Sequence, residues 1–303
     1  MADLAWNGVG LSVPDTWEPA GLERDGLLLE HDGRPACELK WSTVQGVFSF
    51  DRHLKRLARL HKGVELLSVD LADTPPAWAG AVAELERAGL RLKSFLWRAD
   101  EHRGLGASLH HPATGLAALV QFFVRDHRDE DTAASVLATL RDHTGGRTVP
   151  WTLFGLTARV PAEYRLETFS FRPGRYTVRY WRPRSPRRQG RMPAGKGPGA
   201  RLVFERFVPA DVLLRHADLA AWTRATLDPG LDPGPDPGGS ARAVAWAGVA
   251  RTSPLRRLLR RERHARGRVW TTPENAILAV TVDGTDAMEA TVFATVAGSY
   301  GLV

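Results

Sequence analysis

The amino-acid sequence predicts an α+β protein made of two similar antiparallel-sheet-plus-helix halves in tandem. The first observation behind this prediction is an internal repeat, in which the motif VPDTW at 13–17 matches VPAEY at 160–164. The second observation is that segments 36–41 and 176–181 alternate apolar and polar residues, which is typical of half-buried strands. The third observation is that the order of expected strands and helices repeats from one half to the other.

The elements of each half follow from local patterns. In the first half we expect an apolar strand at 9–13, a strand at 36–41, an amphipathic helix at 49–61, a buried strand at 115–124 and a closing helix at 131–140. In the second half we expect strands at 153–160, 176–181 and 277–282, a helix at 209–226 that begins at a proline, and a closing helix at 286–299 with Asp286 and Glu289 at capping-box spacing. A short glycine-containing link at 144–147 separates the halves, so the predicted domains are 1–146 and 147–303.

Two segments interrupt the second half. Residues 182–201 contain no acid, are dense in proline and glycine, and show no periodicity, which predicts a disordered basic loop. Residues 228–240 contain three Asp-Pro-Gly units, each of which favours a turn and resists both helix and strand. We therefore expect a linker there, whose aspartates are also able to neutralise part of a cationic surface.

The motif and the element order resemble the PsbP-like α/β/α sandwich superfamily. The residues that carry the resemblance are Val13, Pro14, Trp17 and Glu18 in the first copy, whereas the second copy matches at Val160, Pro161 and Tyr164. The resemblance implies a tandem duplication of that fold over most of both halves. It also implies a non-enzymatic binding or assembly role, because members of the superfamily include photosystem assembly subunits, a nuclear import factor and secretion chaperones. The basic loop and the Asp-Pro-Gly stretch depart from the family pattern.

Composition indicates the cellular compartment of the protein and whether it spans a membrane. The chain has 303 residues and a single cysteine, Cys37, so no internal disulfide is possible. The N-terminus lacks the pattern of a signal peptide, and the most apolar stretch, 115–124, is too short to span a membrane, which needs roughly 20 residues. We expect a cytoplasmic protein with no transmembrane segment. A monomer is also expected, because an internal duplication can take the place of a homodimer.

Charge is divided unequally between the halves. Residues 1–150 hold 17 Lys+Arg and 21 Asp+Glu, whereas the whole chain has a formal net charge of +7. Segments 182–201 and 251–268 each carry a net charge of +7, so the remainder of the chain is acidic overall. The excess of positive charge is therefore confined to two segments of the second half.

The second basic segment predicts a helix that begins after Ser253, with Pro254 in its first turn and a narrow leucine stripe. The remaining positions are cationic, and so many guanidinium groups repel one another unless an anionic partner is near. A solvated helix face in an arginine-rich protein is the alternative interpretation. With the basic loop added, the predicted partner-binding residues are Arg187, Arg188, Arg256, Arg257, Arg260, Arg261 and Arg263.

No motif indicates catalysis, a metal or a cofactor. The P-loop, dinucleotide-binding and nucleophile-elbow signatures are all missing from the sequence. Cys37 is expected to be a buried, inert thiol, and adjacent His110 and His111 to point to opposite faces of a strand at a turn. The acidic run at 126–131 is better explained as a helix start than as a cation site.

We therefore expect a binding, adaptor or chaperone-like protein whose arginine-rich second half holds an acidic protein. A nucleic-acid-binding protein and an enzyme of an unrecognised family are the alternatives, although neither basic segment interleaves aromatic residues. The chain has ten tryptophans, which predict core packing or an aromatic-lined groove at strand positions: Trp41, Trp97, Trp181, Trp246 and Trp270.

Overall fold

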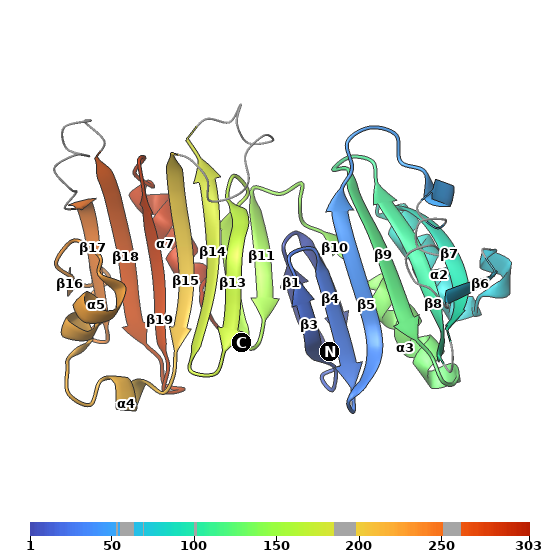
Figure 1. Ribbon diagram of the computed structural model, residues 1–303, viewed down its shortest axis with the longest axis horizontal. Helices are drawn as coiled ribbons and strands as arrows, with labels where there is room; N and C mark the ends of the chain where they lie inside the picture. The colour runs from blue at the N-terminus through green and yellow to red at the C-terminus, as the bar shows by residue number, and fades with distance from the viewer. Residues whose placement is uncertain (53, 55–63, 69, 100–101, 185–197, 251–261) are drawn as a thin grey trace. The chain divides into compact units, whose positions relative to one another are not determined.

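The structure is a computed structural model that describes residues 1–52, 54, 64–68, 70–99, 102–184, 198–250 and 262–303 (Figure 1). Antiparallel sheets with packed helices make it an α+β protein, as the sequence predicts. Among the described residues, no helix is long and apolar enough to cross a membrane.

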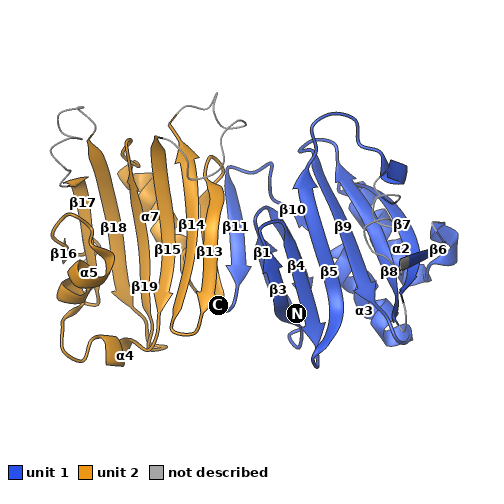
Figure 2. Cartoon of the chain, in the orientation of Figure 1, with its two compact units in different colours: residues 1–155 blue, residues 156–303 orange. Residues whose placement is uncertain are grey.

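The described chain forms two compact units, residues 1–155 and 156–303 (Figure 2). The sequence places the boundary after residue 146, whereas the units divide after residue 155. The difference arises because β11 (Thr148–Leu153) pairs with β1 (Ala2–Trp6), with Ala5 opposite Thr152. The strand that opens the predicted second half therefore completes a sheet of the first unit.

The first unit contains a large and a small sheet. Its remaining strands are β2 (Val9–Val13), β3 (Glu18–Glu23), β4 (Gly26–His31), β5 (Arg34–Thr43), β6 (Val64–Ser68), β7 (Arg91–Ala99), β8 (His102–His111), β9 (Leu116–Phe123) and β10 (Arg141–Asp142). The large sheet has the order β3-β4-β5-β9-β8-β7-β6, which is two antiparallel meanders joined where β5 lies beside β9. The strands β10-β2-β1-β11 pair in the small sheet.

Helices α2 (Pro76–Arg87) and α3 (His127–Ala138) pack against each other and against the large sheet, and a short 3-10 helix, η1 (Leu71–Asp73), precedes α2. The Trp78 Nε1 of α2 donates a hydrogen bond of 2.9 Å to Ser94 Oγ of β7, and its ring lies 5.7 Å from that of Phe122. Helix α2 was not expected. Pro76 in its first turn and the buried Trp78, Val82 and Leu85 at helical spacing were the signals for it.

The second unit also has a seven-stranded sheet. Its strands are β12 (Leu156–Pro161), β13 (Arg165–Arg172), β14 (Arg175–Pro183), β15 (Gly199–Phe207), β16 (Gly234–Pro235), β17 (Ala243–Ala250), β18 (Arg263–Thr271), β19 (Ile277–Gly284) and β20 (Gly301–Leu302). The order β13-β14-β15-β19-β18-β17-β16 corresponds position by position to that of the first unit. Strand β12 pairs with β20 outside this sheet.

One pair of residues recurs at the same place in both large sheets. Trp97 of β7 lies opposite Gly104 of β8, and Trp246 of β17 lies opposite Gly267 of β18. In each case a Cβ on the glycine would collide with the indole ring, so only glycine fits beneath the tryptophan. Such a correspondence is what an internal duplication predicts, and the duplication itself stays a prediction.

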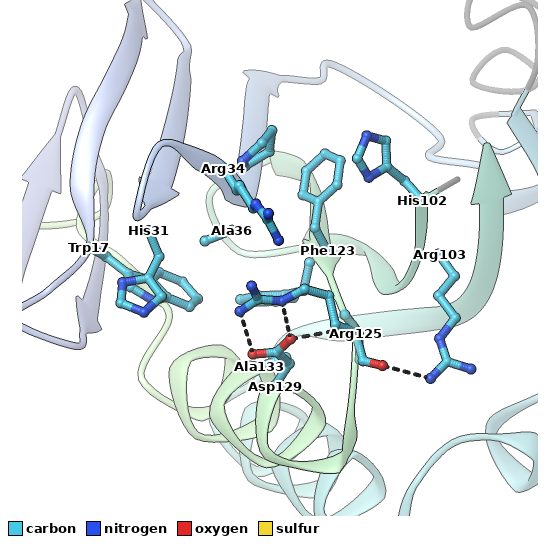
Figure 3. A pocket seen from close by; sticks show the side chains of 13 residues that line it. Trp17, His31, Arg34, Ala36, His102, Arg103, Phe123, Arg125, Asp129 and Ala133 are labelled. Atoms are coloured by element: carbon cyan, nitrogen blue, oxygen red, sulfur yellow. Dashed lines mark hydrogen bonds and ion pairs between the residues drawn. The ribbon is translucent and has the colours of Figure 1, made fainter. Parts of the chain in front are cut away.

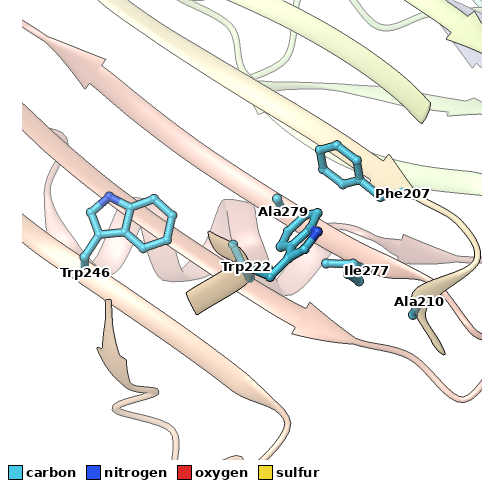
Figure 4. Close-up of a cluster of buried hydrophobic side chains, with 7 residues drawn as sticks. Phe207, Ala210, Trp222, Trp246, Ile277 and Ala279 are labelled. Carbon is cyan, nitrogen blue, oxygen red and sulfur yellow. The ribbon is translucent and has the colours of Figure 1, made fainter. Parts of the chain in front are cut away.

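The helices of the second unit are α4 (Ala210–Leu213), α5 (Leu219–Leu227) and α7 (Ala290–Ser299). The predicted helix at 209–226 is therefore interrupted, and α5 begins anew at Asp218, whose carboxylate accepts a hydrogen bond of 2.7 Å from the Ala221 N–H. Helix α5 covers one face of the sheet through a buried cluster shown in Figure 4: Phe207, Ala210, Trp222, Trp246, Val269, Ile277 and Ala279. The opposite face contacts the α7 segment, where Phe204 lies 5.2 Å from Tyr300.

Several predicted elements are confirmed. The predicted strands at 36–41, 115–124 and 176–181 correspond to β5, β9 and β14, and the predicted helix at 131–140 overlaps α3. Core packing of tryptophan is confirmed for four of the five strand positions, because these side chains are buried: Trp41, Trp97, Trp181 and Trp246. The predicted helix at 49–61 extends beyond the described residues.

Other predictions need correction. Glu289 precedes α7 but makes no side-chain capping bond, so the expected capping box is wrong. The ends of the predicted loop 182–201 belong to β14 and β15, because the ladder continues to Pro183 opposite Gly199. The Asp-Pro-Gly stretch forms the edge strand β16, with Gly234 opposite Ala245, and is not wholly irregular.

Candidate functional site

Of the seven arginines predicted to bind a partner, the structure describes Arg263. Arg187 and Arg188 lie in 185–197, and Arg256, Arg257, Arg260 and Arg261 lie in 251–261, outside the described residues. Arg263 was expected on a helix face, and this is wrong. It begins strand β18, because its backbone joins the antiparallel ladder opposite Ala250 of β17.

The described residues that flank the two basic segments lie at the same end of the large sheet of the second unit (Figure 1). Gly284 of β19 is opposite Ala200 of β15 on one side and opposite His264 of β18 on the other. Within the two basic segments, Ala200 follows residues 185–197, and His264 follows residues 251–261. Since adjacent strands lie about 4.8 Å apart, these two anchor points are separated by roughly 10 Å.

The described arginines at this end of the sheet are already paired. The ion pairs are Arg182–Glu163 at 3.7 Å, Arg184–Asp286 at 3.6 Å, Arg201–Glu167 at 2.6 Å and Arg263–Asp283 at 3.1 Å. The hydrogen bond from Arg201 to Glu167 raises the pKa of Arg201. These four carboxylates therefore each have an arginine as partner, whereas residues 185–197 carry four cations and 251–261 carry five, with no acid in either segment.

A polar cavity of about 300 Å³ opens on the face of this sheet that α5 covers only in part. By strand alternation Arg175, Arg179 and Arg201 share this face with Arg263. Buried Glu205 accepts a hydrogen bond of 2.6 Å from Arg175. Arg179 is exposed, and within the described part of the chain no carboxylate pairs with it. The cavity therefore adds the exposed Arg179 to the cations at this end of the sheet.

The Asp-Pro-Gly stretch also reduces the positive charge of this unit. The Asp236 side chain is 5% exposed and accepts a hydrogen bond of 2.9 Å from Arg268. This confirms the expectation that one of its aspartates folds back onto the cationic surface. The neutralised residue is a strand arginine of β18, so the two acid-free segments are not affected by this pair.

A second cavity, of about 450 Å³, lies within the first unit where β5 and β8 begin and β9 ends (Figure 3). Its described charged lining consists of Arg34, Arg103 and Arg125, with Asp129 as the carboxylate among them. The Arg125 Nε donates a hydrogen bond of 3.0 Å to Asp129 Oδ2, and Arg103 Nη2 donates one of 3.1 Å to the Arg125 carbonyl. Burial opposes ionisation of Asp129, but the hydrogen bonds from Arg125 outweigh it and lower the pKa of Asp129.

Sequence analysis missed this cavity. Its residues come from the start of β5, the start of β8, the end of β9 and helix α3, which are far apart along the chain. No local spacing brings them together, because the contact depends on the sheet order β5-β9-β8. A sequence signal was therefore lacking.

His110 and His111 point in opposite directions, as predicted. The His110 ring stacks on Phe48 at 4.6 Å, whereas His111 Nδ1 lies 2.6 Å from Asp142 Oδ2. The Asp142 side chain is 2% exposed and accepts further hydrogen bonds from Thr114 and Thr144. Burial raises the pKa of Asp142, but these hydrogen bonds more than compensate, so the pKa stays below its usual value of 3.8. These hydrogen bonds to Asp142 join the turn after β8 to strand β10.

Two further sequence expectations hold. Cys37 is 1% exposed, and burial raises the pKa of its thiol, which leaves it protonated and unreactive. The acidic run begins α3, since Asp126 Oδ1 accepts hydrogen bonds from the N–H groups of Arg128 and Asp129 at 2.9 and 3.0 Å. In the described part of the chain, no group of three or more His, Cys, Asp or Glu side chains is arranged to hold a metal ion.

The fold and its cavities define an α+β protein with an arginine-lined cavity in each of its two units. A scan against protein-family models and a search of curated proteins give no match to this chain. The resemblance to the PsbP-like superfamily therefore stays a prediction from the residues that carry it.

Proposed function

We propose that this chain is a non-enzymatic binding or assembly protein that holds an acidic protein partner at one end of the sheet of its second unit. The observation that carries the proposal is the register at Gly284. This residue lies between Ala200 and His264, and so brings the anchor points of both basic segments to one end of the sheet.

Charge supports this assignment. Four of the described carboxylates near this end, Glu163, Glu167, Asp283 and Asp286, pair with arginines. A fifth, Glu262, lies 4.0 Å from His264 Nε2. The cations of residues 185–197 and 251–261 add to an end of the sheet whose nearby acids are already engaged. Concentrated positive charge raises the local concentration of anionic partners and speeds their association.

An acidic protein fits these segments better than a nucleic acid does. Neither 185–197 nor 251–261 contains Phe, Tyr or Trp, so neither supplies the aromatic side chains on which unpaired bases stack. Guanidinium groups pair bidentately with carboxylates, which an acidic polypeptide presents at closely spaced positions.

The test is the affinity of the full chain for fluorescein-labelled polyglutamate, measured by anisotropy at about 50 and 200 mM KCl, where screening differs strongly. We expect the quadruple variant R256A/R257A/R260A/R261A to bind about tenfold more weakly. Four exposed ion pairs at a few tenths of a kcal/mol each together contribute about 1.4 kcal/mol. The double variant R187A/R188A should lose a smaller part of the affinity.

The matched control is R87A/R91A/R128A/R147A, which removes the same charge from exposed, unpaired positions in the described part of the first unit. An equal loss of affinity in this control would show that net charge alone is responsible, and would overturn the proposal. A labelled DNA duplex and a single-stranded RNA serve as competing probes. If either bound more tightly than polyglutamate at both salt concentrations, nucleic acid would replace the acidic protein as partner.

A further inference from the structure

We infer that the 450 Å³ cavity of the first unit is a binding site for a small oxyanion with a flat aromatic body, such as an aryl phosphate or an aryl carboxylate. This site is separate from the proposed function, because all its residues belong to the first unit. A failure of one proposal therefore leaves the other unaffected.

Charge in the cavity is opposite to that of its surroundings. Residues 1–150 are acidic overall, with 17 Lys+Arg against 21 Asp+Glu, yet three arginines and one carboxylate line this cavity. Arg125 and Asp129 neutralise each other. No described carboxylate pairs with Arg34, and Arg103 makes its one described side-chain hydrogen bond to a backbone carbonyl. Among the described lining residues, these two guanidinium groups give a net positive charge.

The helix terminus beside the cavity does not supply the anion site. The first N–H groups of α3 are already capped by Asp126, and the Arg125 N–H donates to Asp129 Oδ2 at 2.9 Å. His31 Nε2 lies 3.6 Å from Asp32 Oδ2, so this side chain already faces a carboxylate. Arg34 and Arg103 therefore remain as the groups available to bind an oxyanion.

The other part of the lining is aromatic. The Trp17 and Phe122 rings lie 6.4 Å apart at 47°, and the Phe123 ring lies 5.8 Å from that of His102. Figure 3 shows Trp17 and His31 on one side of the cavity and Phe123 beside His102 on the other, with Arg34 between them. Apolar walls with a few convergent charged groups are typical of small-molecule sites of this volume.

Both the oxyanion and the aromatic body of the proposed ligand follow from this arrangement. Two guanidinium groups that converge on one cavity are able to form charge-assisted hydrogen bonds to the same oxyanion. A flat ring gains contact area against the aromatic lining at Trp17 or at Phe123, which neither an aliphatic chain nor a bare inorganic anion matches. An aromatic oxyanion uses both features at once.

Isothermal titration calorimetry of the full chain tests this site with 1-naphthyl phosphate, 1-naphthoate, neutral 1-naphthol and inorganic phosphate. We expect saturable binding of one or both naphthyl anions, and at least tenfold weaker binding of 1-naphthol and of inorganic phosphate. The relative affinities of the two naphthyl anions identify the preferred head group.

Two variants identify the residues responsible. R34A/R103A should weaken binding of the preferred anion at least tenfold, while the control R87A/R91A, which removes the same charge outside the cavity, should leave it unchanged. D129N should bind the anion about threefold more tightly or better, because it releases Arg125 and removes the competing carboxylate. An unfolded variant does not produce such a gain.

Three outcomes would overturn the proposal that this cavity binds an aromatic oxyanion. The first is the absence of saturable binding by either naphthyl anion to the unmodified chain. The second is binding of 1-naphthol or of inorganic phosphate as tight as that of the naphthyl anions. Such a result would show that the anionic group or the aromatic ring, respectively, is not recognised. The third is a D129N variant with unchanged or weaker affinity, since the cavity charge would then not control binding.

Discussion

Asp142 illustrates how a single buried carboxylate joins segments that are distant in the first unit. It accepts hydrogen bonds from the Thr114 hydroxyl, the Thr144 N–H and hydroxyl, and the His111 ring. With 2% of its side chain exposed, it depends on these donors in place of water. The group contains the side-chain types of a catalytic triad, but Asp142 lies between His111 and Thr114, so His111 does not activate the threonine hydroxyl.

Substitution of Asp142 is expected to destabilise the first unit. D142N should lower the free energy of unfolding by about 1–3 kcal/mol at pH 7, because an amide leaves part of this hydrogen-bond network unsatisfied. Urea denaturation measures the change. The control is E84Q, which makes the corresponding change at an exposed glutamate and should stay within about 0.5 kcal/mol of the unmodified chain.

The effect of D142N should also depend on pH. Because the pKa of Asp142 is lower in the folded than in the unfolded chain, its contribution is present above about pH 4 and is lost as pH falls through the folded pKa. The difference in stability between D142N and the unmodified chain should therefore shrink between pH 5 and pH 3. A difference that stays constant over this range would contradict the assignment.

At the scale of elements, each recurring Trp–Gly pair packs an indole ring against the glycine opposite it on the neighbouring strand. A Cβ at Gly104 would lie 2.8 Å from the Trp97 ring, and one at Gly267 would lie 2.5 Å from Trp246 Cε2. Trp246 also belongs to the core beneath α5, so its ring is not able to move away without opening that cluster.

We expect G267A to destabilise the chain by about 1–3 kcal/mol through overpacking. In a W246L background the same substitution should cost much less, because the smaller side chain makes room for the added methyl group. A double-mutant cycle by urea denaturation measures this coupling. G298A, which adds a methyl group into open space on α7, is the control and should be neutral or slightly stabilising. Equal costs of G267A in both backgrounds would argue against the contact.

At the scale of the whole molecule, each unit has its own seven-stranded sheet and its own buried aromatic residues. Trp6, Trp78 and Trp151 are fully buried in the first unit, and Trp222 and Trp246 pack in the second. Units with separate cores are able to fold separately.

Residues 1–155 produced alone should therefore fold. We expect a cooperative urea transition followed by tryptophan fluorescence, and 1-naphthyl phosphate or 1-naphthoate binding equal to that of the full chain, because every cavity residue is present. A fragment that ends at residue 146, the boundary expected from sequence, should be less stable because it lacks β11. A broad, non-cooperative transition for residues 1–155 would contradict the division.

The parts of the fold that sequence analysis predicted are those with local signals. Alternation identified β5 and β14, and a continuous apolar run identified β9. The predicted helix at 131–140 overlaps α3, but α3 begins earlier, after Asp126. Helix α2 was missed although its buried positions follow helical spacing, and the predicted helix at 209–226 proved to be two short ones. These differences depend on tertiary packing, which ends a helix early and places Arg263 in a strand, and local sequence propensity does not report such packing.

By itself, the sequence determined the α+β class, the burial of Cys37, and the confinement of positive charge to two segments, because composition, alternation and spacing are properties of the chain. Only the tertiary structure decided that both segments are anchored beside Gly284, and that Arg34, Arg103 and Arg125 meet at one cavity. The physical reason is that antiparallel pairing brings together strands that are far apart in sequence, and the register of those strands is set by the buried face as a whole.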